Sequence, residues 1–418
     1  MIRKLLRLRR DRAGNILIIT ALSMPVVIGA GGLATDTVQW TVWQRQIQRQ
    51  ADSAALAGAY ARSQDAGVVA AATADINRHS FVTLLGSPTI ENAPTTGAYA
   101  GNMDAVRVVL KTQRSLPFSS LFLSSAPILT VEATAAVLQN GNYCVISLER
   151  TPAAGITIDG NATVNMGCGM STNSSSTAAV TAGGSSNVYA TPISAVGGLP
   201  ASSHYASGTV LLPYSVPQAD PFESLPEPVL PTPCSPKLSV NPTETRNVVP
   251  DSTGVGCFRG MDLKGTVHFD PGVYYIDGGE FSAGSQAVIS GSGVTFILTS
   301  NNATSNPGSI ATIDMNGGAS VNLTAPTSGT YSGVLFYQDR RALDTNDNKI
   351  NGNSGSKLEG AIYMPGQSLT FNGTSGMNTE CLQLVSRRVG FSGNTNITNN
   401  CPTGGSHSFT GTRVELVG

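Results

Sequence analysis

The stretch ILIITALSMPVVIGAGGLA, residues 16–34, decides the architecture of this chain. It carries no charge, and its length is close to the roughly 20 residues that a helix needs to cross the hydrocarbon core of a bilayer. Six basic residues precede it (Arg3, Lys4, Arg7, Arg9, Arg10 and Arg12), and the first charge after it is Asp36. By the positive-inside rule, this asymmetry predicts a single span with residues 1–15 in the cytoplasm and the chain after about Asp36 outside.

Two other interpretations of residues 16–34 compete with a membrane anchor. A cleaved secretory signal has a shorter apolar region followed by a small-x-small site, whereas here the run is long and the helical pattern continues beyond it. A buried helix of a soluble protein would leave the basic residues in front of it unexplained. We therefore expect an anchor, with the lipid bilayer as its first partner.

The overall composition favours an extracytoplasmic, β-rich protein. A chain of 418 residues is long enough for two or three domains. Its net charge of −1 provides no general attraction to nucleic acid, so we expect no nucleic-acid partner. Only 12% of the residues are charged and 46 are glycine, a balance typical of extracellular proteins with many turns.

The six cysteines all follow the predicted span: Cys144, Cys168, Cys234, Cys257, Cys381 and Cys401. None forms a CxxC pair and the histidines are scattered, so the spacing of a zinc site is absent. On the predicted topology they lie in an oxidising compartment, where an even number of cysteines indicates disulfides. The simplest of the many connectivities pairs neighbours in sequence, 144 with 168, 234 with 257 and 381 with 401.

The helical pattern continues past the span, so that residues 16–63 form one transmembrane and extended helix. A seam recurs along it at alternating three- and four-residue steps: Trp40, Trp43, Ile47, Ala51, Ala54, Gly58 and Ala61. The tryptophans suit an interfacial aromatic belt, and the small residues allow another backbone to approach closely. The seam packs either on the protein's own globular part or on another subunit, as a homo-oligomer or a docked partner; the pattern leaves both open.

Several features of this region resemble the N-terminal module of TadG-like proteins of the tight-adherence (Tad/Flp) pilus system. They are the lead RRDRAGN, the proline-containing span, Asp36 just after it and the run QRQADSAALAGAYA, which together cover roughly the first 65 residues. The resemblance implies a bacterial envelope protein with a short cytoplasmic tail, connected with pilus assembly or surface attachment. Other pilus-assembly or envelope proteins are the partners that it implies.

Residues 64–140 predict a membrane-proximal α+β part. Residues 64–80 remain helical in composition, after which the period changes to two. Apolar residues alternate in 104–112 and again in 128–138, as in half-buried strands, and the loop RSLPFSSLFLSSAP separates them. A long helix packed on a small antiparallel sheet is a pilin-like arrangement.

Residues 141–418 predict a β-rich ectodomain, which makes the chain mainly β. Short apolar runs end in Gly, Asn, Asp or Ser turns, and the phrase Gly-Asn-x-x-Val/Ile returns at Gly160 and Gly393. This pattern favours a right-handed parallel β-helix (solenoid), with a β-sandwich as the alternative. The Pro-rich segment at about 213–250 is expected to be an ordered strap, tied to the β structure through Cys234 and Cys257.

The ectodomain also resembles the glycine-rich β domain found joined to some TadG-like modules, in its phrases PGVYYIDGG, LTAPTSGTYSGVLFYQDR and GAIYMP. That resemblance supports the architecture and implies no activity. TadG-like proteins often carry a von Willebrand A domain instead, with an Asp-x-Ser-x-Ser metal motif. The motif is missing here, so adhesion through such a metal ion is not expected.

One dense ionic stretch, FYQDRRALDTNDNK, is the place where catalysis would have to lie: it contains Asp339, Arg340, Arg341, Asp344, Asp347 and Lys349. It is most simply a polar loop. Asp344, Asn346 and Asn348 alternate as calcium ligands would, but Lys349 stands where an EF-hand needs glycine and Gly355 where it needs glutamate. Nucleophile, zinc-protease, phosphate and dinucleotide motifs are absent. We expect no enzyme, no catalytic or cofactor-binding residues and no metal site.

The sequence therefore predicts a single-span protein of the bacterial inner membrane, with its C-terminal domain periplasmic. Its expected role is structural, in the assembly of a Tad/Flp-type pilus or in surface adhesion. The alternative is a tethered carbohydrate-binding or carbohydrate-active β-solenoid. A groove lined by acidic and aromatic side chains would favour that alternative, but only 6% of the residues are aromatic.

Overall fold

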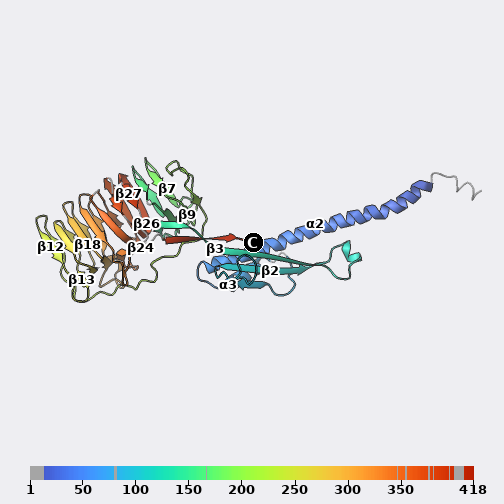
Figure 1. The fold of residues 1–418 in the computed structure, drawn as a ribbon, viewed down its shortest axis with the longest axis horizontal. Coiled ribbons are helices and arrows are strands. Elements are labelled where there is room, and N and C mark those ends of the chain that lie inside the picture. Colours follow the sequence, from blue (N-terminus) through green and yellow to red (C-terminus); the bar gives the residue numbers. More distant parts are fainter. Residues whose placement is uncertain are drawn as a thin grey trace, which may run out of the picture. The chain divides into compact units, whose positions relative to one another are not determined.

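The protein is mainly β, with one long apolar helix near the N-terminus (Figure 1). The computed structural model describes residues 14–79, 82–165, 167–345, 347–353, 355–374, 377–379, 381–394, 396–399 and 409–418. The chain divides into two compact units, Met1–Leu138 with Val414–Gly418, and Gln139–Arg413.

The first unit packs two helices against an antiparallel sheet. Helix α2 spans Gly14–Arg62, and α3 spans Val68–Arg78. The sheet contains β1 (Thr89–Asn92), β2 (Ala105–Gln113) and the first part of β3 (Ile128–Ser147), in the order β1–β2–β3. A short helix, η1 (Ser119–Leu121), lies in the loop between β2 and β3.

The alternating pattern in residues 104–138 produces this sheet. In β2, Val106, Val108 and Leu110 are fully buried, because side chains two residues apart share a face of a strand. Val106 lies opposite Ala135, and Leu110 lies opposite Val131. The predicted antiparallel pairing of these two stretches is confirmed, and β1 adds a third strand that the sequence pattern did not predict.

Two boundaries differ from the expected ones. The helix ends at Arg62 and resumes at Val68, after a turn in which Asp65 has a φ of 51°, so residues 64–80 do not simply continue it. The extreme C-terminus does not stay with the rest of 141–418. Val417 donates to the carbonyl of Thr134 at 2.8 Å, and residues 414–418 belong to the first unit.

Among the residues that the structure describes, the second unit contains mostly short strands, together with the 3₁₀ turn η2 (Pro307–Ser309). Its strands up to the middle of the chain are β4 (Ile156–Ile158), β5 (Thr163–Asn165), β6 (Gly169–Thr172), β7 (Val180–Ala182), β8 (Asn187–Tyr189), β9 (Ile193–Ala195), β10 (Leu211–Leu212), β11 (Leu238–Val240), β12 (Thr245–Val248), β13 (Val255–Phe258), β14 (Met261–Leu263) and β15 (Thr266–Phe269). The later ones are β16 (Gly272–Asp277), β17 (Glu280–Ala283), β18 (Val288–Ser292), β19 (Val294–Thr299), β20 (Thr312–Met315), β21 (Ser320–Thr324), β22 (Val334–Gln338), β23 (Asp347–Ile350), β24 (Lys357–Thr374), β25 (Met377–Thr379), β26 (Leu382–Asn394) and β27 (Asn396–Asn399). The last strand, β28 (Phe409–Leu416), begins in the second unit and ends in the first.

From β11 to β21, each strand pairs in parallel with the strand three places further along the chain. β11 pairs with β14, β14 with β17, β17 with β20 and β20 with β23, and the two interleaved series follow the same rule. The long strand β24 then takes up all three series, and β26 pairs in parallel with it. A large parallel sheet is therefore present, which is consistent with the β-rich ectodomain predicted for this region.

The order of strands in space differs from the order in sequence. β26 pairs not only with β24 but also with the first strands of the unit, so that Leu384 lies beside Val145 and Val389 beside Ile156. From there the stack continues through β6 and β9 to β10. The two ends of the stack are thus β10 and β11, which are neighbours in sequence, and residues 213–237 cross between them. The strap expected at about 213–250 therefore ends earlier than predicted, because 238–240 and 245–248 form β11 and β12. Figure 1 shows β9 and β12 at opposite ends of this unit.

A continuous column of apolar side chains fills the interior of the stack. Tyr274, Phe296 and Phe336 occupy aligned positions, and the Phe296 and Phe336 rings stack with centroids 5.2 Å apart. The column continues through Ile362, Leu384, Val145, Met170 and Ile193, which are all fully buried. Residues from both ends of the sequence therefore share one core.

The turns of this unit explain the repeated Gly-Asn phrase. Gly160 and Gly393 have φ values of 72° and 71°, in the left-handed region that glycine adopts without strain. The two turns lie on top of each other, since the backbone N–H of Asn161 donates to the carbonyl of Gly393 at 2.9 Å. The repeat noticed in the sequence therefore joins turns that are adjacent in space.

Candidate functional site

The first part of α2 presents an uncovered apolar surface. Every large apolar side chain described between Ile16 and Leu33 is more than half exposed: Ile16, Ile18, Ile19, Leu22, Met24, Val26, Val27, Ile28 and Leu33. The helix is long and apolar enough to cross a membrane. An apolar surface of this extent is rare on a soluble protein and suits a lipid environment.

The predicted seam lies on the second part of α2, and the protein's own first unit covers it. Ile47, Ala51 and Ala54 are fully buried. They belong to one apolar cluster with residues of α3, β2 and β3, including Val106 and Val131. Of the two alternatives for the seam, packing on the protein's own domain is therefore the one found, and these residues are not a free docking surface.

The small residues of the seam are required by the closeness of the sheet. A Cβ atom added to Gly58 would lie 2.9 Å from Cγ1 of Val106, closer than such atoms pack. Trp40 and Trp43, at the other end of the seam, are only half-buried. The guanidinium of Arg114 lies over the Trp43 ring, 4.7 Å from its centroid, in a cation–π contact.

Asp36, the first charge after the apolar stretch, holds the loop between β2 and β3. Its carboxylate accepts hydrogen bonds from the backbone N–H groups of Phe118 (3.1 Å) and Ser119 (2.5 Å) and from the Ser119 hydroxyl (2.5 Å). Burial alone would raise the pKa of Asp36, but these three hydrogen bonds lower it overall. The side chain is therefore a carboxylate that anchors a turn, and sequence reasoning did not find its partners.

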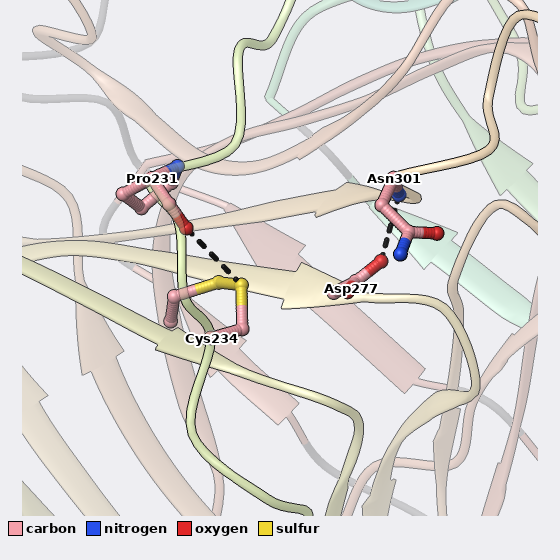
Figure 2. The surroundings of a disulfide bond; sticks show 5 residues. Pro231, Cys234, Asp277 and Asn301 are labelled. Carbon is pink, nitrogen blue, oxygen red and sulfur yellow. Dashed lines mark hydrogen bonds between the residues drawn. A yellow bond between two sulfur atoms is a disulfide. The ribbon is translucent and has the colours of Figure 1, made fainter.

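Two of the three predicted disulfides are present among the described residues, Cys144–Cys168 and Cys234–Cys257. Cys381 is also disulfide-bonded, whereas Cys401 lies outside the residues that the structure describes. The second bridge connects the Pro-rich segment to β13, which confirms the predicted attachment of the strap. Figure 2 shows Cys234, whose Sγ lies 3.3 Å from the carbonyl oxygen of Pro231.

Several residues of the ionic stretch make contacts within the second unit. Asp339 is fully buried and accepts hydrogen bonds from Thr299 Oγ1 (2.6 Å) and from Arg341 Nη2 (2.6 Å). Arg340 points the other way, donating to the carbonyls of Leu225 (2.8 Å) and Phe222. It therefore clamps the strap onto the β structure.

A tyrosine completes this clamp. Arg340 Nε donates to the hydroxyl of Tyr363 at 2.8 Å, and that hydroxyl donates to Asp220 Oδ2 at 2.6 Å. Arg340 also lies over the rings of Tyr337 and Tyr363, 5.7 and 5.4 Å from their centroids. The tyrosines and the arginine together connect β22 and β24 with the strap.

The next part of the stretch is tied to a second buried carboxylate. Glu149, 1% exposed, accepts from Arg387 Nε (3.0 Å) and Arg388 Nη1 (2.7 Å). Arg388 Nη2 also donates to both carboxylate oxygens of Asp344, at 2.6 and 2.7 Å. Burial acts to raise the pKa of Glu149, but hydrogen bonds from Thr151 and from the two arginines outweigh it and lower the pKa to about 2.

Two of the three residues in the calcium pattern, Asp344 and Asn348, have other partners. Asp344 pairs with Arg388, while Asn348 is buried, accepting from the backbone N–H of Ile313 at 3.0 Å. Asn346 and the side chain of Asp347 lie outside the described residues. Within the part of the chain that the structure describes, no three His, Cys, Asp or Glu side chains are grouped to hold a metal ion.

An open, polar cleft lies beside β16 and the turn that follows β19, with a volume of about 560 Å³. Its polar lining residues are Arg259, Asp277, Ser300, Asn301, Ser309 and Thr312. Asp277 is tied to the opposite wall, since its carboxylate accepts from the backbone N–H of Asn301 at 2.7 Å (Figure 2). The cleft offers hydrogen-bonding groups, and no aromatic ring is among its described lining residues.

The exposed apolar helix and the packed seam lie in the part of the chain that matches a known protein family. Residues 14–63 match the Tad family model, "Putative Flp pilus-assembly TadE/G-like". The matched region coincides with α2, so the TadG-like N-terminal module predicted from the sequence is confirmed; we call residues 14–63 the Tad module. The comparisons with curated proteins and with solved structures found no match.

Proposed function

We propose that this chain is a membrane-anchored protein of the bacterial envelope, with a structural or assembly role in a Tad/Flp-type pilus or in surface attachment. The observation that carries the proposal is the match of residues 14–63 to the pilus-assembly family. The apolar first part of the Tad module supplies the anchor. The basic residues in 1–15 support a cytoplasmic N-terminus in the inner membrane, with the remaining chain extracytoplasmic.

For the second unit we propose a right-handed parallel β-solenoid. The constant pairing of each strand with the third strand along supports it, since each set of three strands then forms one coil stacked on the next. The aligned column from Tyr274 to Ile193 is the interior that such coils share. A β-sandwich, the alternative, is built from antiparallel sheets and would not account for the parallel ladders.

The proposed role is non-enzymatic. Asp339 and Glu149 are each bound by arginine and by backbone or hydroxyl donors, which supports a structural use of the ionic stretch. The polar cleft beside Asp277 favours the second candidate function, carbohydrate binding, because its groups can hydrogen-bond sugar hydroxyls. Titrating the protein with envelope polysaccharide, with Arg259→Ala as the variant, tests that candidate.

A free face of the Tad module is available for assembly contacts. Val38, Val42, Arg45 and Arg49 are all exposed and recur at three- and four-residue steps, which places them on one side of α2. Val38 and Val42 are 63% and 47% exposed. This face, rather than the buried seam, is where we expect pilus-assembly proteins to bind.

Cross-linked co-purification from membranes tests the assembly role. The variant carries Val38→Ser and Val42→Ser, and the matched control carries Val69→Ser and Ala70→Ser on the exposed side of α3. We expect pilus-assembly proteins with the wild type and the control, and their loss with the variant. If no pilus-assembly protein is recovered with the wild type, the proposed role is wrong.

A further inference from the structure

Within the loop between β2 and β3, residues 115–127 carry no charge and expose large apolar side chains. At its tip Leu121 is 74%, Phe122 75% and Leu123 52% exposed. Three consecutive exposed side chains of this size form a local apolar patch rather than the scattered exposure usual on soluble surfaces. We call residues 115–127 the apolar loop.

The apolar loop is fixed at the point where the anchor helix leaves its apolar stretch. Asp36, two residues after that stretch ends, accepts the hydrogen bonds from Phe118 and Ser119. A Cβ atom on Gly32, which is inside the stretch, would overlap the ring of Phe118. The loop therefore lies alongside residues 32–36 of α2.

The contact with the helix extends to the tip of the loop. The Phe118 and Phe122 rings pack with centroids 5.3 Å apart, so Phe122 is one ring away from Gly32. If residues 16–34 span the bilayer, the membrane boundary passes near residue 34, at the level of this loop. Trp43 and Arg114 lie on the aqueous side, about 10 Å further along the helix from Asp36 at a rise of about 1.5 Å per residue.

We propose that Leu121, Phe122 and Leu123 insert into the outer boundary of the lipid bilayer as a second membrane contact. The loop is suited to that depth because it has no charge, its serines can satisfy backbone groups near the headgroups, and its aromatic ring belongs at the interface. Deeper insertion is excluded, since an irregular loop cannot satisfy its backbone in hydrocarbon. This inference rests on the proposed anchor.

The second contact has a consequence for the whole first unit. A single helix leaves the attached domain free to tilt and to rotate about the helix axis. A loop that is bonded to α2 and also inserted in lipid removes that freedom, because two points of attachment define the orientation of the sheet. The β2–β3 hairpin would then present the free face of the Tad module in one direction along the membrane.

Tryptophan quenching by brominated lipid tests the insertion in the full-length chain. The protein is reconstituted in phosphatidylcholine–phosphatidylglycerol vesicles, with or without bromine on the acyl chains. The probes are Phe122→Trp and, separately, Leu121→Trp. The matched control is Met103→Trp, 58% exposed at the opposite end of β2, and Val27→Trp reports on the span itself. The signal of native Trp40 and Trp43 is subtracted using the wild type.

We expect the emission of the tryptophans at 122 and 121 to shift to the blue and to lose most of its intensity in brominated vesicles, while that at 103 is unchanged. Quenching at 122 and 121 no greater than at 103 overturns the insertion. A blue shift without quenching also overturns it, because a protein surface would then cover the loop. Absence of quenching at position 27 refutes the anchor itself, so the two failures are distinguishable.

Discussion

The buried seam of α2 should tolerate no added volume, and Ala54→Leu is the sharpest perturbation of it. Ala54 is fully buried in the cluster formed by α2, α3, β2 and β3. The sheet approaches so closely that even a Cβ on neighbouring Gly58 would meet Val106 at 2.9 Å. Overpacking of this kind costs about 1–3 kcal/mol of unfolding free energy.

Hydrogen–deuterium exchange of the full-length protein measures this effect locally, because each unit can open separately. In Ala54→Leu we expect the amides of β2 and of the first part of β3 to exchange about 5-fold to 150-fold faster. The matched control is Ala70→Leu, the same substitution at an exposed position of α3, which should leave exchange unchanged. Equal exchange in Ala54→Leu and the wild type would refute the packing argument and leave the seam available for a partner.

Three further predictions concern the second unit. Arg340→Gln should release the strap and make limited proteolysis of residues 213–237 faster, because the hydrogen bonds to Phe222, Leu225 and Tyr363 weaken with the loss of charge. The control is Arg246→Gln, which removes the ion pair with Glu244 and should not change the rate of cleavage. Removing the Cys234–Cys257 disulfide by the double substitution Cys234→Ser and Cys257→Ser should lower the free energy of unfolding by about 3 kcal/mol, because the unfolded chain gains the entropy that the closed loop had restricted. Denaturant unfolding of the variant and the wild type measures the difference. Because folding lowers the pKa of Glu149 from 4.5 to about 2, the ionised side chain contributes fully to folding stability above pH 4.5, and this contribution is lost as the pH falls toward 2. Glu149→Gln should therefore lower the free energy of unfolding by about 2 kcal/mol at neutral pH and make it less dependent on acid pH, as denaturant unfolding across this pH range would measure.

Local patterns predicted the elements and several of their contacts. The length and neutrality of residues 16–34 predicted the apolar helix, and alternation in 104–138 predicted two paired strands. Spacing alone predicted the disulfides at Cys144 and Cys234, because a loop of twenty-odd residues closes easily on itself. These features depend on neighbours close in sequence, which is why the sequence contains the signal.

Contacts between distant segments could not be read in the same way. The seam from Ile47 to Gly58 predicts that one face of the helix is buried. It does not predict what covers that face, since the same periodic pattern is expected whether a partner or the protein's own sheet packs on it. The ionic stretch was predicted most simply as a polar loop. Its contacts could not be predicted, because they involve Phe222 and Glu149, which are far away along the chain. The sequence predicted residues 115–127 only as part of a loop. Their position beside α2 depends on hydrogen bonds to Asp36, which lies on another element.

Sequence pattern alone predicted the long apolar helix, the two alternating strands of the first unit and the Tad module near the N-terminus. Only the tertiary structure decided that the seam is covered by its own domain, that β26 joins the first strands of the second unit, and that the strap must cross between β10 and β11. The physical reason is that burial and backbone pairing are satisfied by any surface of matching shape and periodicity. Which surface is used depends on the packing of the whole chain.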